Sequence, residues 1–197
     1  SRSRDRSRSR DRDGGLSMRL IIGGLAALVV VTATAAMVAP AGTQEFGVVS
    51  AEFDSETPTV IRQGESGSIT YRVPNGGLVP VVVYLAPESE GVTTEPERLY
   101  VSGRSAENAT LTFSAPPETG YYRRYVGEYR YLAILPASVI DASYRVHPWL
   151  PILIIDAVIG IPFYLIGMFL VGTGRLRSRS RARDSVSTVR RLLNRYG

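Results

Sequence analysis

The chain has 197 residues, with 23 basic and 18 acidic side chains, one His and no Cys. The lack of cysteine excludes a disulfide framework and a thiolate metal site, and one histidine excludes any site that needs two imidazoles. Every basic residue is arginine, a bias that favours a GC-rich genome such as that of an archaeon or an actinobacterium.

The net charge of +5 is unevenly distributed along the chain. Residues 1–19 hold seven Arg and three Asp, and residues 175–197 hold eight Arg and one Asp, whereas residues 20–174 carry a net charge of −6. The basic isoelectric point therefore averages two basic ends and an acidic centre, and it is not by itself an argument for nucleic-acid binding.

Residues 1–19 are an Arg/Ser-rich repeat that we expect to be disordered. One interpretation is RNA binding, which makes an Arg/Ser-rich nucleic-acid binder one alternative function. Beside an apolar segment, however, a polybasic stretch is typical of a cytoplasmic flank that faces anionic lipid headgroups. We therefore expect this segment to be cytoplasmic and disfavour nucleic acid as a partner.

Residues 20–39 are uncharged and mainly apolar, and Pro40 follows them. As a helix they would rise about 30 Å, the thickness of the hydrocarbon core, so they predict a first transmembrane helix. The run after Met18-Arg19 also fits a cleaved signal peptide. Because Met37-Val38-Ala39 before proline is a poor cleavage site, an uncleaved anchor is favoured.

Residues 40–135 read as short strands separated by turn residues. Several strands alternate polar and apolar positions, as expected when one face is buried, whereas Val79–Leu85 is apolar throughout and fits a strand buried on both faces. About seven strands predict a mainly β ectodomain, an extracytoplasmic immunoglobulin-like β-sandwich, in addition to two transmembrane helices. The expected strands are Phe46–Phe53, Thr59–Arg62, Ser68–Val73, Val79–Leu85, Arg98–Val101, Ala109–Phe113 and Tyr121–Leu135.

The turns between these strands resemble those of immunoglobulin-like modules of prokaryotic surface proteins. The resemblance rests on G-E-S-G at 64–67, V-P-N-G-G-L-V-P-V-V-V at 73–83, G-V-T-T-E-P at 91–96 and A-P-P-E-T-G-Y-Y at 115–122. It implies a fold rather than a function. In the same domain Asn108-Ala109-Thr110 is an N-glycosylation sequon, so Asn108 is a candidate glycosylation site.

Residues 136–148 are predicted to form a juxtamembrane amphipathic helix on the outer membrane surface, with an apolar stripe of Val139, Ile140, Tyr144 and Val146. The second transmembrane helix is predicted over residues 149–174. His147 and Trp149 stand at its boundary and are expected to be interfacial. A catalytic pair of His147 with Asp141 or Asp156 is disfavoured, because no nucleophile elbow accompanies it.

Asp156 is an acidic residue inside the second apolar segment. A carboxylate in the hydrocarbon region costs several kcal/mol unless it is paired, protonated or hydrated. We predict an intramembrane polar contact to another membrane protein, and the alternative is a protonated or snorkelling acid near the headgroups. No catalytic, cofactor-binding or metal-ligating residue is predicted.

Arg19, Arg175 and Arg177 flank the two apolar segments. Because arginine clusters next to membrane helices stay in the cytoplasm, both termini are expected there, and residues 40–148 outside, in a multi-pass protein of the cell membrane. Residues 175–197 are then a cytoplasmic basic tail, in which an apolar stripe from Val186 to Tyr196 predicts an amphipathic helix.

Four stretches resemble a known family: Y-R-Y-L-A-I-L-P at 129–136, H-P-W-L-P-I-L-I-I-D at 147–156, I-P-F-Y-L-I-G at 161–167 and G-T-G-R at 172–175. They are similar to the C-terminal membrane region of long haloarchaeal proteins of the signal peptidase I type, in which a serine peptidase domain precedes a β-sandwich. The peptidase motif Ser-Met-x-Pro is not found here, since Arg19-Leu20 follows Ser17-Met18. The resemblance therefore implies a non-catalytic region.

These observations predict a non-catalytic integral membrane protein that presents an extracytoplasmic β-sandwich as an accessory or interaction module. Its expected partners are the lipid bilayer and, through Asp156, a peptidase or translocon component. The alternative is the membrane and β-sandwich portion of a signal peptidase I-type serine peptidase acting on secreted proteins. No cofactor is expected.

Overall fold

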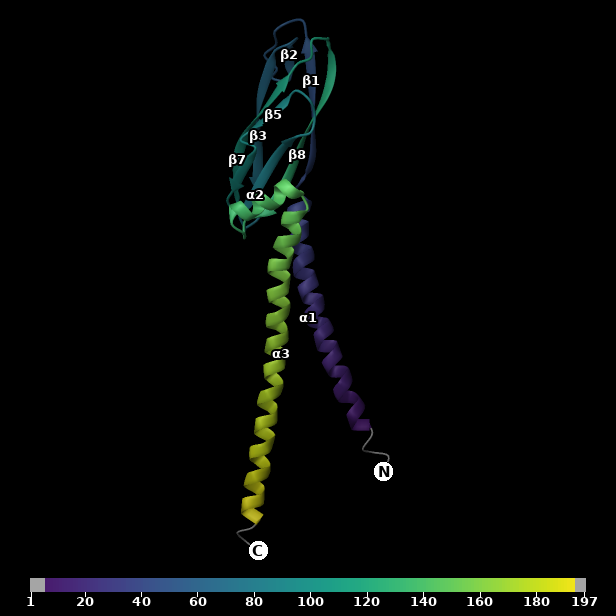
Figure 1. Cartoon of the computed structure of the whole chain (residues 1–197), viewed down its shortest axis with the longest axis vertical. Helices are drawn as coiled ribbons and strands as arrows, with labels where there is room; N and C mark the ends of the chain where they lie inside the picture. The colour runs from purple at the N-terminus through teal and green to yellow at the C-terminus, as the bar shows by residue number, and fades with distance from the viewer. Residues whose placement is uncertain (1–5, 194–197) are drawn as a thin grey trace. The chain divides into compact units, whose positions relative to one another are not determined.

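The structure, a computed structural model, describes the backbone of residues 6–193 and the side chains of residues 18–172. This part of the chain forms three helices and eight strands, in the order α1, β1 to β8, α2 and α3 (Figure 1). The chain divides into two compact units. One contains the outer parts of α1 and α3, and the other, Thr32–Asp156, contains all the described strands, α2 and the adjoining turns of both long helices. We call Thr32–Asp156 the β unit.

Two helices are long and apolar enough to cross a membrane. α1 spans Arg6–Val38 and α3 spans Leu150–Leu193. Their apolar parts, Met18–Val38 and Leu150–Gly172, nearly coincide with the segments predicted from the sequence. α1 ends just before Pro40, whose ring cannot continue the helical hydrogen-bond ladder.

The basic flanks differ from the sequence-based expectation in their backbone structure. α1 begins at Arg6, so most of residues 1–19 are helical instead of disordered. α3 continues without a break to Leu193, in place of a separate amphipathic helix in the tail. Arginine is a good helix former, which lets a helix nucleated in an apolar segment extend into its basic flank.

The strands form two hydrogen-bonded sheets. A five-stranded sheet has the order β2-β1-β8-β4-β6, and a three-stranded sheet has the order β3-β7-β5. β1 and β2 are parallel, and the other paired strands are antiparallel. The strand bounds are β1 Gly42–Ala51, β2 Val60–Arg62, β3 Ser66–Asn75, β4 Val81–Pro87, β5 Val92–Glu95, β6 Arg98–Val101, β7 Ser105–Ser114 and β8 Gly120–Leu132.

Both sheets contribute to one apolar core. In β3 and β7 the buried positions alternate with exposed ones, as the sequence predicts. Leu111 and Phe113 of the three-stranded sheet are fully buried in the same cluster as Val48 and Val83 of the five-stranded sheet. Alternation along the strands thus places one apolar face of each sheet in a common core. A predominantly β fold with two apolar helices is therefore confirmed, with eight strands in the described residues instead of about seven.

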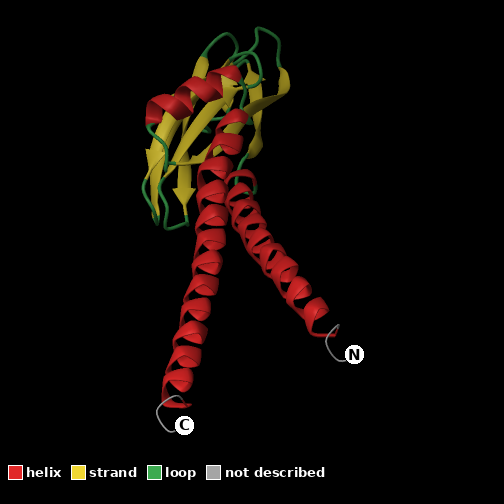
Figure 2. Ribbon diagram, turned by 60° about the horizontal axis from the view of Figure 1, so that its bottom comes forward, coloured by secondary structure: helices red, strands yellow, loops and turns green. Residues whose placement is uncertain are grey.

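The helix α2, Ala137–Val146, covers the outer face of the five-stranded sheet (Figure 2). The ring of Tyr144 stacks on that of Tyr84 with 4.0 Å between the centroids, and Ile140 is fully buried. This cover explains why Val81–Leu85 is buried on both faces. The predicted apolar stripe is therefore wrong in part, because Ile140 and Tyr144 pack on the sheet while Val139 and Val146 remain exposed.

The last residues of β8 extend beyond β1. β1 pairs with β8 from Gly42, which lies opposite Glu128, and β8 continues for four more residues to Leu132. Those four residues pair with β4 on one side. The last turns of α1 directly precede Gly42. This end of the sheet is therefore the one next to α1, and we call it the helix-bearing end of the β unit.

Candidate functional site at the helix-bearing end of the β unit

The two long helices are joined by a hydrogen bond within the β unit. The hydroxyl of Thr34 in α1 donates to Oδ2 of Asp156 in α3 at 2.6 Å. Oδ1 of Asp156 is shielded from solvent and has no hydrogen-bond partner in the described part of the chain. Asp156 therefore makes a polar contact with another helix of this chain, whereas the sequence led us to expect a contact with another membrane protein.

Buried apolar residues neighbour Thr34 and Asp156 along the two helices. Ala33 and Met37 lie one helical turn apart on α1, and Ile152 and Ile155 lie three residues apart on α3. All four are buried, Met37 and Ile155 almost completely. The Thr34–Asp156 contact thus lies in an apolar setting, where an unpaired carboxyl group would be unfavourable.

A buried ion pair stands on the interior face of β8, close to the same end. The guanidinium of Arg130 donates through Nε to Glu128 and through Nη1 to the carbonyl of Pro74 at 2.6 Å. The hydroxyl of Tyr71 donates to the second carboxyl oxygen of Glu128 at 2.7 Å. Burial and this contact with Glu128 raise the pKa of the Tyr71 phenol above its ordinary value.

The ion pair was not predicted from the sequence. Glu128 and Arg130 are 2% and 8% exposed. In the sequence they alternate with Tyr129 and Tyr131, which resembles a strand with a polar outer face. The structure reverses this pattern, because α2 covers the tyrosine face and the charged pair points between the sheets.

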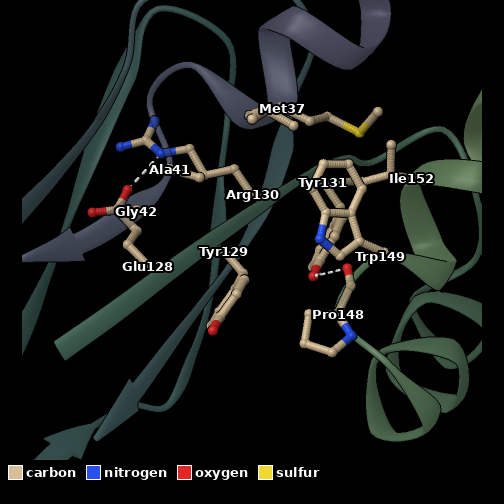
Figure 3. A pocket seen from close by; sticks show the side chains of 11 residues that line it. Met37, Ala41, Gly42, Glu128, Tyr129, Arg130, Tyr131, Pro148, Trp149 and Ile152 are labelled. Atoms are coloured by element: carbon tan, nitrogen blue, oxygen red, sulfur yellow. Dashed lines mark hydrogen bonds and ion pairs between the residues drawn. The ribbon is translucent and has the colours of Figure 1, made fainter. Parts of the chain in front are cut away.

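A pocket of about 200 Å³ opens where α1, β8 and the start of α3 meet within the β unit (Figure 3). Its walls are mostly apolar, and the Glu128–Arg130 pair forms its polar side. The hydroxyl of Tyr131 donates to the carbonyl of Pro148 at 2.7 Å and fixes the start of α3 beside β8. The lining residues are Met37, Val38, Ala41, Gly42, Glu128, Tyr129, Arg130, Tyr131, Pro148, Trp149 and Ile152.

Asp141 attaches α2 to the sheet. Its two carboxyl oxygens accept hydrogen bonds from the Tyr84 hydroxyl and from the Arg98 guanidinium. The hydrogen bond from Tyr84, assisted by Arg98, holds the pKa of Asp141 below its usual value. The carboxyl group is thus occupied in a structural contact.

The structure does not bring His147 to either candidate carboxylate. Nδ1 of His147 accepts a hydrogen bond from the backbone N–H of Trp149 at 3.1 Å. Asp141 is held by Tyr84 and Arg98, and Asp156 is held by Thr34. Residues 18–172 contain no group of three His, Asp or Glu side chains placed to hold a metal ion.

The remaining predicted residues lie at separate places. Trp149 is half exposed at the start of α3 and lines the pocket. Asn108 is exposed on β7, and Arg19 is exposed on α1. The side chains of Arg175 and Arg177 fall outside the described residues, although the backbone of α3 passes through both positions.

Comparisons with known proteins assign no family. No protein-family model matches the chain, and no curated protein matches it. Among solved structures it is similar to SSP-19, an MSP-domain protein like family member in Caenorhabditis elegans, with 15% identity and a TM-score of 0.33, over 43% of this chain and 77% of that chain. For a PapD-like domain of human CEP192 the identity is 12% and the TM-score 0.27, over 46% of this chain and 83% of that chain.

A third similar structure is the Pseudomonas aeruginosa CupB2 chaperone, with 13% identity and a TM-score of 0.24 over 40% of this chain and 53% of that chain. Likenesses this weak assign neither a function nor a partner. None of these comparisons tests the resemblance to the membrane region of signal peptidases.

Proposed function

We propose that this chain is a membrane protein that crosses the bilayer twice and holds its β unit on the extracytoplasmic side as a non-catalytic interaction module. In this proposal the two sheets form an immunoglobulin-like sandwich, both termini are cytoplasmic, and the module contacts another membrane protein or a translocated chain.

The observation that carries the proposal is the order of apolar helices and arginines around the β unit. Met18–Val38 precedes the strands and Leu150–Gly172 follows them. Arg19 lies at the far end of the first segment, and Arg175 and Arg177 lie just past the second. The positive-inside rule favours a cytoplasmic location for these arginines, and two crossings then put the β unit on the opposite side.

The exposure of the apolar helices supports a lipid environment. Large apolar side chains remain open on both segments, with exposed fractions of 60% for Leu28 and 70% for Phe169. A core helix of a soluble domain would bury such side chains against neighbouring elements. Lipid would cover them in the proposed arrangement.

An interaction role is supported by the pocket at the helix-bearing end. Binding sites typically have mostly apolar walls and a few polar groups at fixed positions. The volume of about 200 Å³ suits one or two apolar side chains of a partner. Asp156 is less suited to an intermolecular contact, because Thr34 occupies one carboxyl oxygen and the other is shielded. We therefore propose that Asp156 joins the two helices of this chain and that the partner docks beside Trp149.

A protease-accessibility experiment tests the topology. A protease recognition sequence inserted between Ser55 and Glu56, in an exposed loop, gives a cleavage site on the β unit. The same sequence inserted after Ser180 gives the matched control in the basic tail. In spheroplasts, added protease is expected to cut the first variant and to cut the second only after detergent is added. Cutting of the tail variant alone would refute the proposal.

A further inference from the structure

Three large apolar side chains are exposed on two loops of the β unit. Leu78 and Val79 lie between β3 and β4, with exposed fractions of 73% and 42%, and Ile134 follows β8 with 42%. The proposed function assigns these side chains no role.

The two loops form one surface. The backbone N–H of Ala133 donates to the carbonyl of Pro80 at 2.9 Å, which ties the residues after β8 to those before β4. The N–H of Arg104 donates to the carbonyl of Gly77 at 2.8 Å, so the exposed Arg104 belongs to the same surface. We call the surface of Leu78, Val79, Ile134 and Arg104 the apolar tip.

The conformation of the apolar tip is fixed by Asn75. Its buried side-chain amide donates to the carbonyls of Val79, Val101 and Ser102 at 2.9–3.2 Å, and its Oδ1 accepts from the N–H of Gly77 at 3.0 Å. Gly103 also lies against this loop, since a Cβ atom there would come within 2.1 Å of the Leu78 carbonyl oxygen. Leu78 and Val79 are therefore exposed on a loop whose conformation is fixed by hydrogen bonds and close packing.

Strand register places the apolar tip at the level where the apolar helices begin. Tyr131, near the end of β8, contacts Pro148, which directly precedes Trp149 and α3. Leu132 is the next residue, Val81 lies opposite it, and Val79 and Ile134 continue past this pair in the same direction. The tip thus lies past the last paired residues of β4 and β8, at the same end of the sheet as Pro148.

We propose that the apolar tip inserts into the headgroup region of the outer leaflet and acts as a third membrane contact beside the two helices. Leu78, Val79 and Ile134 enter the boundary between headgroups and acyl chains, and Arg104 meets lipid phosphates. This contact fixes the tilt of the β unit on the membrane and holds the pocket mouth at its surface. The inference rests on the proposed function, because it requires the β unit to sit on a bilayer.

Site-specific fluorescence tests the insertion in the full chain reconstituted into liposomes of zwitterionic and anionic phospholipids. Because the chain has no natural cysteine, Leu78→Cys gives one attachment site for an environment-sensitive nitrobenzoxadiazole probe. Phe53→Cys is the matched control, since Phe53 is also a well-exposed apolar side chain, at 65%, beyond the opposite end of β1.

The probe at residue 78 is expected to emit at shorter wavelength than the probe at residue 53. It should also be quenched several-fold more by lipids that carry a spin label near the headgroup, and less by aqueous iodide. Equal iodide quenching at residues 78 and 53 would overturn the inference. A shielded probe at residue 78 that spin-labelled lipid does not quench would also overturn it, because another copy of the chain would then cover the tip.

The proposed function can fail or stand independently of this result. An impermeant maleimide added to intact cells that express Phe53→Cys reports the side on which the β unit lies. Labelling at residue 53, combined with an aqueous signal at residue 78, would retain the topology and reject the membrane contact of the tip.

Discussion

The hydroxyl of Thr34 and the carboxyl group of Asp156 form a 2.6 Å hydrogen bond between residues 122 positions apart in the sequence. Each residue lies inside an apolar helix that could cross a membrane. A carboxyl group in such a setting is unfavourable without a donor. The pair therefore joins the last turns of α1 to the first turns of α3 within the β unit.

Removing only the donor is expected to destabilise the chain. Thr34→Val leaves both oxygens of Asp156 without a partner among the described residues and should lower the free energy of unfolding by about 1 kcal/mol. The double variant Thr34→Val with Asp156→Leu should recover most of that loss, because it removes the polar group as well. Chemical unfolding in detergent micelles, arranged as a double-mutant cycle, measures the coupling. Strictly additive effects of the two substitutions would contradict the contact.

The ion pair of Glu128 and Arg130 gives a larger effect on stability. Arg130→Met leaves Glu128 buried without its cation and should lower the free energy of unfolding by ~3–5 kcal/mol. Arg123→Met is the matched control on the same strand, because the Arg123–Glu45 pair, at 3.4 Å, is exposed and such pairs contribute less than about 1 kcal/mol. Denaturant unfolding followed by near-UV circular dichroism compares the two variants. Equal losses would show that the buried pair has no special role.

The attachment of α2 should weaken in acid. The folded-state pKa of Asp141 lies below its usual value, so its contribution to stability is present above the unfolded-state pKa and is lost as the pH falls through the folded-state pKa. Loss is therefore expected below about pH 4. The near-UV signal of the stacked Tyr84 and Tyr144 rings, followed against pH, reports it. Asp141→Asn should reduce the change in the near-UV signal below about pH 4. A pH profile identical to that of the unsubstituted chain would show that Asp141 does not cause the change.

Trp149 offers an intrinsic reporter of the membrane boundary. It is the single tryptophan of the chain and is half exposed at the start of α3. In liposomes its emission should lie at shorter wavelength than that of tryptophan in water. Brominated lipids should quench it most when the bromine lies near the headgroup. Strongest quenching by bromine at the ends of the acyl chains would place Trp149 in the bilayer centre and contradict the boundary.

The sequence predicts the parts of this fold that depend on local pattern. Both apolar helices follow from uninterrupted hydrophobic runs, and β3 and β7 follow from strict alternation around Val73 and Leu111. The helix α2 also begins next to Pro136, as expected. β5, Val92–Glu95, was missed because only one of its two buried positions, Val92, is apolar, and the other is Thr94.

The contacts of the candidate site depend on tertiary structure, and the local pattern does not contain them. Thr34 looks like an ordinary small residue of an apolar helix, and only the packing of α1 against α3 within the β unit gives it Asp156 as a partner. Glu128 and Arg130 look like exposed strand residues, and only the cover by α2 on the opposite face turns them inward. Long-range pairing decides which polar residues are buried, and periodicity cannot assign it.

Labelling of single cysteines reports the side of the membrane on which each segment lies, because the natural chain contains no cysteine. Thr110→Cys places a thiol on the exposed face of β7, and Ser180→Cys places one in the basic tail. In intact cells a membrane-impermeant maleimide should label residue 110 and should reach residue 180 only after permeabilisation. Two results would contradict an extracytoplasmic β unit with a cytoplasmic tail. One is labelling of residue 180 but not of residue 110 in intact cells, and the other is equal labelling of both residues.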